Sequence, residues 1–153
     1  TLFESAVITD YIAQISAVSM EPEDELKRAQ MRAWSEYFNS CFDALMAVLQ
    51  ASDKDSFEQT NKVLINKFQP LENILPSDGP FFYGEKMMTI DCAYAPLFLR
   101  MKTLHELYPA FSLNGLPENS QRWMDSLLAC DVLKKSIMGD FHAIFRMFIS
   151  KMA

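Results

Sequence analysis

The residues with the clearest capacity for chemistry stand at the start of the chain, where Glu4 and Ser5 precede an apolar helical pattern. Apolar side chains recur from Val7 to Ile15 at spacings of three and four, which indicates a helix that Ser5 can cap. The first turn of a helix has unpaired backbone N–H groups and the positive end of the helix dipole. Such a turn can bind a carboxylate, and the same residues also suit a plain helix cap.

Cysteine and histidine offer little further chemistry in this sequence. Cys41, Cys92 and Cys130 lie far apart, form no C-x-x-C pair, and each falls within an apolar pattern. Burial raises the pKa of a thiol and suppresses its thiolate form, so we expect three structural cysteines in a reducing compartment. His105 and His142 have no carboxylate or cysteine at metal-ligand spacing. We therefore expect no metal site.

The composition favours a helical protein of the cytoplasm. The 153 residues are half apolar, carry a formal net charge of -6 and include only four glycines, so turns are few. The acidic balance argues against nucleic acid as a partner, because nucleic-acid binding needs clustered lysine and arginine. No apolar run approaches the roughly 20 residues that cross a bilayer, and no signal peptide opens the chain. We expect no membrane partner.

Helical periodicity predicts the elements that would position these residues. Pro22 interrupts the apolar pattern, and we place a linker at residues 19–23 between an N-terminal part, residues 1–18, and a domain of residues 24–153. Residues 1–4 resemble the end of a strand. A long helix follows the linker, and Pro70 should bend the next helix near Gln69, because proline removes a backbone donor.

The second half of the chain continues the helical pattern. Residues 91–100 are charged only at their two ends, which is typical of a helix enclosed by others, and Pro96 should kink it. A shorter helical segment carries Trp123 and Leu133, and an amphipathic helix that begins near Phe141 ends the chain. The sequence therefore predicts an all-α helical bundle.

Three segments carry a family resemblance. Residues 1–12, T-L-F-E-S-A-V-I-T-D-Y-I, are similar to a strand-turn-helix of the form L-x-E-S-x-x-I-x-x-Y-L. Residues 79–101 are similar to a G-P-[YF]-x-x-G loop that leads into an x-x-x-D-x-x-x-x-P helix. Residues 22–34 are similar to the helix start of many bacterial and omega-like members. Together these segments resemble the cytosolic glutathione transferase superfamily.

The resemblance implies a two-part protein with glutathione as its co-substrate. Residues 1–18 would be the last strand-turn-helix of a thioredoxin-like domain, and residues 24–153 the helical C-terminal domain. Ser5 would then donate to the γ-glutamyl carboxylate of glutathione, and Glu4 would accept from its ammonium group. The strand that carries the family's catalytic Tyr, Ser or Cys lies outside this chain, so we assign no catalytic residue.

The family also builds a pocket for a small hydrophobic electrophile from the first and last helices of the C-terminal domain. In omega-like members an arginine lines this pocket. Packing in the core is the competing interpretation for the aromatic residues, and a surface position is the competing one for the arginine. The family's dimers imply a homodimer. The matching residues of this chain are Trp34, Tyr37, Phe38, Arg100, Phe145 and Phe148.

One position departs from the family pattern at the start of the second motif helix. Members usually have Ser or Thr three residues before the aspartate, and here Asp91 follows Met88 at that spacing. We expect Thr89 to cap the helix instead. Asp91 would then occupy the second helical position, without the reciprocal bonds of a capping box.

The function implied by the resemblance is conjugation of glutathione to electrophiles or glutathione-dependent thiol reduction. An alternative is a non-enzymatic adaptor, because the segment from Ile90 to Pro96 also resembles stringent starvation protein A, a transferase-like partner of RNA polymerase. A third interpretation is an assembly module, a role that such helical domains have in other complexes.

Overall fold

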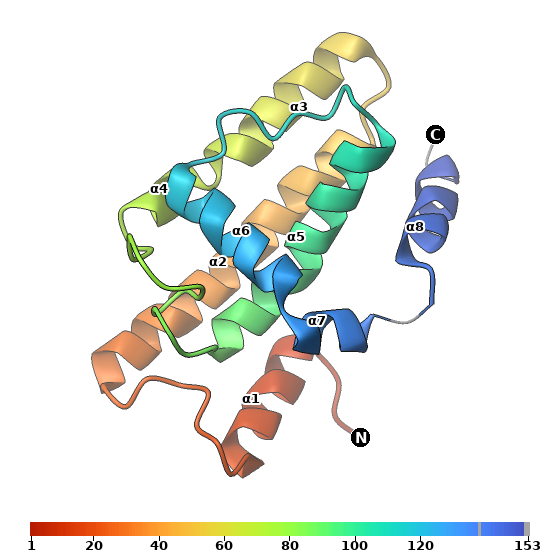
Figure 1. Ribbon diagram of the computed structural model, residues 1–153. Coiled ribbons are helices and arrows are strands. Elements are labelled where there is room, and N and C mark those ends of the chain that lie inside the picture. Colours follow the sequence, from red (N-terminus) through yellow and green to blue (C-terminus); the bar gives the residue numbers. More distant parts are fainter. Residues whose placement is uncertain (138, 152–153) are drawn as a thin grey trace.

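The computed structural model describes residues 1–137 and 139–151, and in this part of the chain it is helical (Figure 1). Residues 1–4, expected to end a strand, form no strand there, and one isolated bridge joins Phe81 to Gly84. The expected all-α fold is confirmed. The helices are α1 (Ser5–Ile15), α2 (Glu25–Leu49), α3 (Lys54–Asn66), α4 (Gln69–Glu72), α5 (Thr89–Leu107), α6 (Glu118–Ala129), α7 (Asp131–Ser136) and α8 (Phe141–Ser150).

Aspartate side chains start three of these helices. Asp24 accepts a hydrogen bond of 2.7 Å from the Lys27 N–H at the start of α2. Asp53 and Ser56 form a reciprocal capping box at α3, and Asp140 caps α8. Each cap satisfies a backbone N–H that the helix itself cannot pair, which fixes where the helix begins.

The core lies where α5 meets its neighbours, as expected for an enclosed helix. Helix α5 packs against α1, α2, α6 and α8, and α2 pairs with α3. Tyr94 and Phe98 of α5 contact the Trp123 ring with centroids 4.8 and 4.9 Å apart. These rings are fully buried, and burial of each large apolar side chain contributes roughly 1.5–3 kcal/mol.

The break predicted near Pro70 is confirmed. Helix α3 ends at Asn66 and α4 begins at Gln69, with Pro70 in the first turn, where no backbone donor is needed. Helix α5 by contrast runs through Pro96, and a kink there stays a prediction. The segment from Trp123 to Leu133, predicted as one helix, is two helices that meet at Cys130, whose backbone is extended.

The G-P-F-F-Y-G segment forms a tight turn before α5. Phe81 and Gly84 exchange two backbone hydrogen bonds of 3.0 Å. Gly79 has φ +83° and packs so closely that a Cβ atom would lie 2.7 Å from the Gly84 Cα. Both the dihedral angle and the contact require glycine at this first position of the motif.

The expected cap of α5 is wrong. The N-cap residue is Met88, and Thr89 is the first residue of the helix. Asp91 occupies the third position and accepts the Met88 backbone N–H at 2.8 Å. A methionine side chain cannot return a bond, but its backbone N–H still donates, so the helix keeps half of the capping box instead of starting one residue later.

The expectation of three buried cysteines is correct only for Cys41. Cys92 is exposed and Cys130 is half-buried, and all three are free thiols. Cys92 follows the buried Asp91, but its position on α5 turns away from the core. An apolar stretch of sequence does not specify which side of a helix is covered. No helix of the described residues is long and apolar enough to cross a bilayer.

Candidate functional site

The predicted Glu4–Ser5 turn is an exposed and strained helix start. Ser5 is the first residue of α1 and is therefore not its cap. Glu4 occupies the N-cap position with φ 69° and makes no capping bond with its side chain. Among the described residues it is the only non-glycine residue with a positive φ. Such a conformation costs of order 1–3 kcal/mol and is found most often at functional sites.

The backbone N–H groups of this turn are unpaired in the described residues. The first intrahelical bond of α1 runs from the Ile8 N–H to the Glu4 carbonyl at 3.0 Å, and the preceding N–H groups of Ser5, Ala6 and Val7 have no acceptor. In the helices capped by aspartate, α2, α3 and α8, the cap side chain accepts from one of the corresponding N–H groups. The turn therefore has the donors and the dipole of an anion-binding site.

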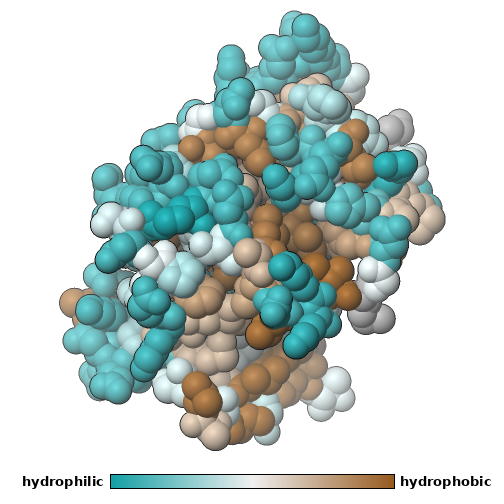
Figure 2. Space-filling view, viewed as in Figure 1, coloured by the Kyte–Doolittle hydropathy of each residue, from teal (hydrophilic) through white to brown (hydrophobic). Residues whose placement is uncertain are grey.

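Helix α1 also exposes several apolar side chains. It has no buried residue, and among the described helices its main packing partner is α5. Figure 2 shows apolar side chains gathered over α1 at the lower end of this face. Such a group of exposed apolar side chains is typical of a surface that contacts another domain or another protein. The exposed residues are Leu2, Phe3, Val7, Ile8, Tyr11, Ile12, Ile15 and Val18.

Four of the six predicted pocket residues belong to one continuous row across α2, α5 and α8. Ring centroids lie 5.8 Å apart for Phe38 and Phe42, and 5.6 and 6.2 Å apart along the three aromatic residues of α8. The Arg100 guanidinium lies 5.9 Å from a ring on each side and joins the two halves. We call this set the aromatic row: Phe38, Phe42, Arg100, Phe141, Phe145 and Phe148.

Two members of the aromatic row were missed in the sequence. Phe42 lies one turn after Phe38 on α2, and Phe141 lies one turn before Phe145 on α8. The four-residue spacing was therefore visible in both cases.

Trp34 and Tyr37, the other two predicted pocket residues, contact each other instead. Their rings meet edge to face with centroids 5.4 Å apart. The Tyr37 hydroxyl donates to the Lys67 carbonyl at the end of α3, at 3.1 Å. The Trp34 carbonyl accepts from the Tyr94 hydroxyl at 3.0 Å. In the described residues neither ring forms an aromatic pair with a member of the aromatic row.

Arg100 is half-buried between two helices. Its Nη1 group donates to the Pro96 carbonyl one turn earlier at 2.8 Å. Burial lowers the pKa of Arg100, although a guanidinium remains a cation at any physiological pH. The side chain thus places a positive charge within an otherwise apolar row, between Phe42 of α2 and Phe141 of α8.

Few contacts hold α8 in place. Phe145 is its one buried residue in the described part of the chain, whereas Phe148 is 44% exposed. His142 Nε2 lies 2.7 Å from Glu106 Oε2, which links α8 to the end of α5. The position of this helix therefore depends on the aromatic row, on Ile149, which packs against the core, and on this polar contact.

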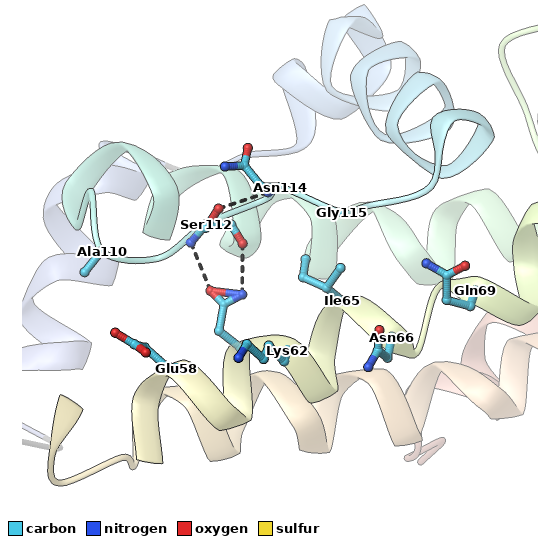
Figure 3. Close-up of a pocket in the computed structure, with 10 residues that line it drawn as sticks. Glu58, Lys62, Ile65, Asn66, Gln69, Ala110, Ser112, Asn114 and Gly115 are labelled. Atoms are coloured by element: carbon cyan, nitrogen blue, oxygen red, sulfur yellow. Dashed lines mark hydrogen bonds between the residues drawn. The ribbon is translucent and has the colours of Figure 1, made fainter. Parts of the chain in front are cut away.

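A separate groove of about 600 Å³ lies between α3 and the loop after α5 (Figure 3). The buried Asn61 side chain holds the loop, because it donates to the Ser112 carbonyl and accepts from the Ser112 N–H, both at 2.9 Å. Polar side chains such as Asn66 and Gln69 line the rim. None of the predicted site residues lines this groove.

Solved structures of glutathione transferases share this fold. The Omega 3C enzyme of Trametes versicolor aligns with a TM-score of 0.82 and 16% identity, over 98% of this chain and 65% of that one. The Tau class enzyme of mango, Mangifera indica, aligns with a TM-score of 0.79 and 21% identity, over 99% of this chain and 71% of the mango enzyme. The trimeric transferase TDR1 of Leishmania aligns with a TM-score of 0.73 and 19% identity, over 98% of this chain and 34% of TDR1.

Curated relatives add sequence identity to the shared fold. The probable glutathione S-transferase parC of Nicotiana tabacum is 31% identical over 93 residues, which are 59% of this chain and 42% of the relative. Glutathione S-transferase 3 of Glycine max is 30% identical over 90 residues, which are 58% of this chain and 41% of the relative. Over part of its length the chain is therefore similar in sequence to glutathione S-transferases, and it shares their helical fold. No protein-family model matches it.

The matches cover only part of each curated relative. The chain spans about two fifths of the length of the curated relatives it matches. Its helical fold matches the C-terminal helical domain of the superfamily. Omega and Tau structures align almost equally well, so the likeness is to the superfamily's helical domain rather than to one class.

Proposed function

We propose that the protein carrying this chain conjugates glutathione to small hydrophobic electrophiles, with this chain as its helical domain. The curated relatives support the proposal, because both are named glutathione S-transferases. Glutathione-dependent thiol reduction is a related reaction that uses the same co-substrate. The proposed location is the cytoplasm, where a reducing glutathione pool is maintained.

The observation that carries the proposal is the open turn at Glu4 and Ser5. A γ-glutamyl carboxylate placed there would accept from the free N–H groups of Ser5 and Ala6 and from the Ser5 hydroxyl. The Glu4 carboxylate would accept from the ammonium group of the same γ-glutamyl residue. Ligand binding gives a reason for a strained, uncapped helix start that contributes nothing to packing.

The aromatic row supports the second half of the proposal. It joins α2 and α8, the helices from which the resemblance predicts the electrophile pocket, and part of it is accessible at Phe148. Aromatic rings offer a large apolar surface to a planar electrophile. Trp34 and Tyr37 would contribute by supporting α2 against α3 rather than by direct contact.

A homodimer is proposed as the assembled form. Charged side chains at the start of α2 make contacts within the chain. Glu21 lies 3.6 Å from Arg28 and 3.4 Å from Arg32, and Arg28 donates to the Pro22 carbonyl. Light scattering on the full-length protein distinguishes a dimer from the trimer named for the Leishmania neighbour.

Binding of glutathione to the full-length protein tests the proposed function. In isothermal titration, Ser5→Ala should weaken glutathione binding about tenfold, because a hydrogen bond to a charged group contributes about 1.5–3 kcal/mol. Ser16→Ala is the matched control, since it removes the same hydroxyl at the other end of α1. If the wild-type protein does not bind glutathione, or if the two variants behave alike, the assignment of this turn is wrong.

A further inference from the structure

The groove between α3 and the loop after α5 is a preformed space apart from the proposed transferase site. Its volume of about 600 Å³ lies within the range of about 300–1,000 Å³ that is usual for ligand-binding pockets. Both bonds between Asn61 and Ser112 cross from α3 to the loop, so they hold the two walls at a fixed distance. Figure 3 shows the loop running along α3, with Ile65 pointing from the helix into the space between them.

The lining of this groove is polar, unlike that of a pocket for a small apolar molecule. In the described chain Ile65 and Ala110 are the apolar side chains of the lining, and no aromatic ring belongs to it. Pockets for drug-sized ligands are lined mostly by apolar and aromatic side chains, and single-stranded nucleic acid is bound by stacking of its bases on rings. The lining instead suits a ligand with many hydrogen-bonding groups, such as a polypeptide main chain, which has a donor and an acceptor at nearly every residue.

Both walls of the groove have hydrogen-bonding groups without a partner in the described residues. On the helical side these are the side-chain amides of Asn66 and Gln69, and each amide can both donate and accept. On the loop side the backbone N–H and carbonyl of Gly115 are unpaired. The N–H and C=O groups of successive residues in an extended chain point to opposite sides. An extended peptide lying in the groove would therefore meet a donor and an acceptor on each side.

The helical wall also has the length and the repeat of a short extended peptide. Glu58, Lys62 and Asn66 are four residues apart on α3, which places them about 6 Å from one another along the helix. Gln69, at the start of α4, continues this wall to about 16 Å. Alternate residues of an extended chain are about 6.6 Å apart, so about five residues would span the wall and meet its polar side chains in turn.

Charge specifies a further property of the ligand. Lys62 is exposed and forms no ion pair in the described part of the chain, whereas the neighbouring Glu58 lies 3.7 Å from Lys54. Glu58 is thus already compensated, and the uncompensated charge at the rim is positive. Because complementary charges across an interface favour one partner over others, this cation selects a peptide with a carboxylate.

We propose that this groove binds an extended peptide segment of about five residues that carries a carboxylate, so that the chain acts as a docking module for another protein. The main chain of the segment would bond to both walls, and its carboxylate would pair with Lys62. Asn61 is a positioning residue that holds the loop wall. Docking in this groove is independent of the proposed transferase function, because no residue of its lining belongs to the Glu4–Ser5 turn or to the aromatic row.

A positional library of peptides tests the docking site. The probes are pools of fluorescent, N-acetylated and C-amidated pentapeptides, each pool with one residue type fixed at one position, and fluorescence anisotropy measures their binding to the full-length protein. Pools with Asp or Glu fixed at one position should bind about fivefold more tightly than the corresponding Asn or Gln pools. Lys62→Ala should abolish this preference. Lys135→Ala is the matched control, because it removes an exposed lysine from α7, outside the groove, and it should change nothing.

Two further measurements test recognition of the main chain and the location of the site. N-methylation of single residues in the best-binding peptide should weaken binding at one or more positions, because each methyl group removes an N–H donor. Asn66→Ala should weaken binding of the same peptide about threefold without a change in melting temperature, since its side chain is exposed. Glutathione binding should be unchanged in Lys62→Ala and in Asn66→Ala.

Several results would overturn the docking site. They are equal binding of all pools, an acidic preference that survives Lys62→Ala, and loss of that preference in Lys135→Ala. A peptide whose affinity tolerates N-methylation at every position would exclude recognition of the main chain. If the groove instead takes up a second copy of the chain, no pool binds, and Lys62→Ala shifts the oligomeric state in light scattering. Failure of glutathione binding, by contrast, would reject the transferase function and leave the docking site in place.

Discussion

The indole nitrogen of Trp123 donates a hydrogen bond of 2.7 Å to the Asp91 carboxylate, between α6 and α5. The same carboxylate accepts from the backbone N–H groups of Phe82 at 2.9 Å and Met88 at 2.8 Å. Asp91 thus joins the tight turn, the start of α5 and the middle of α6. Burial raises the pKa of Asp91 above its usual value, and these donors oppose the rise.

Replacement of Asp91 by alanine should destabilise the fold strongly. Loss of the carboxylate leaves two buried N–H groups and one partly buried N–H group without an acceptor, and each orphaned buried donor costs about 1–3 kcal/mol. We expect a decrease of about 4 kcal/mol in the free energy of unfolding, measured by urea denaturation. Asp43→Ala is the control, because Asp43 is exposed on α2. A loss below about 1 kcal/mol would contradict this role of Asp91.

The stability of the fold should fall at alkaline pH in a way that depends on Cys41. Burial raises the pKa of the Cys41 thiol from 9.0 to about 12. Between these values the unfolded chain loses the proton and the folded chain keeps it, so the free energy of unfolding decreases as the pH rises. The thiol's stabilisation is complete below pH 9 and is lost as the pH approaches 12.

The Cys41→Ala variant isolates this effect from other alkaline titrations. The difference in unfolding free energy between wild type and variant should shrink by up to about 1.4 kcal/mol for each pH unit above 9. Urea denaturation at a series of pH values measures it. A difference that stays constant from pH 8 to 11 would show that Cys41 is not protected from ionisation.

Asn61 should stabilise the loop that follows α5. Its amide satisfies both backbone groups of Ser112, and its side chain is buried. Asn61→Ala should lower the free energy of unfolding by about 2 kcal/mol, because two buried backbone groups lose their partners. Asn66→Ala, an exposed change on the rim of the same groove, should have almost no effect. Equal effects of the two changes would argue against this role.

Two phenylalanines of α8 should differ sharply in their contribution. Phe145 is 4% exposed and Phe148 is 44% exposed. Phe145→Ala should cost about 3 kcal/mol and make α8 sensitive to limited proteolysis, since truncation leaves a cavity against α5. Phe148→Ala should cost clearly less, about 1 kcal/mol, because much of its ring is already exposed in the folded protein. The opposite order would mean that α8 packs through another face.

Local interactions explain what could be predicted from the sequence. The long helix after Pro22, the break before Pro70 and the enclosed character of α5 follow from apolar spacing and from proline chemistry. These features depend on residues within one or two turns of each other. The glutathione transferase resemblance was carried by equally local motifs, at Glu4–Ser5 and at the Gly79 turn.

The candidate site was only partly predictable. Phe38 and Arg100 were identified in advance, but the contact between them runs through Phe42, which the core stripe did not include. Tyr37 contacts the end of α3 instead of the aromatic row. Neighbouring positions on a helix point in different directions, and sequence alone does not say which neighbour each direction meets.

The sequence by itself determined where helices form, where proline interrupts them and which family the motifs resemble. Only the tertiary structure decided that Asp91 caps α5 through the Met88 backbone, that Cys92 is exposed, and that Arg100 lies between rings of α2 and α8. The physical reason is the range of the interactions. Backbone preferences and apolar spacing act over a few residues, whereas burial, charge compensation and ring contacts depend on segments far apart in the chain.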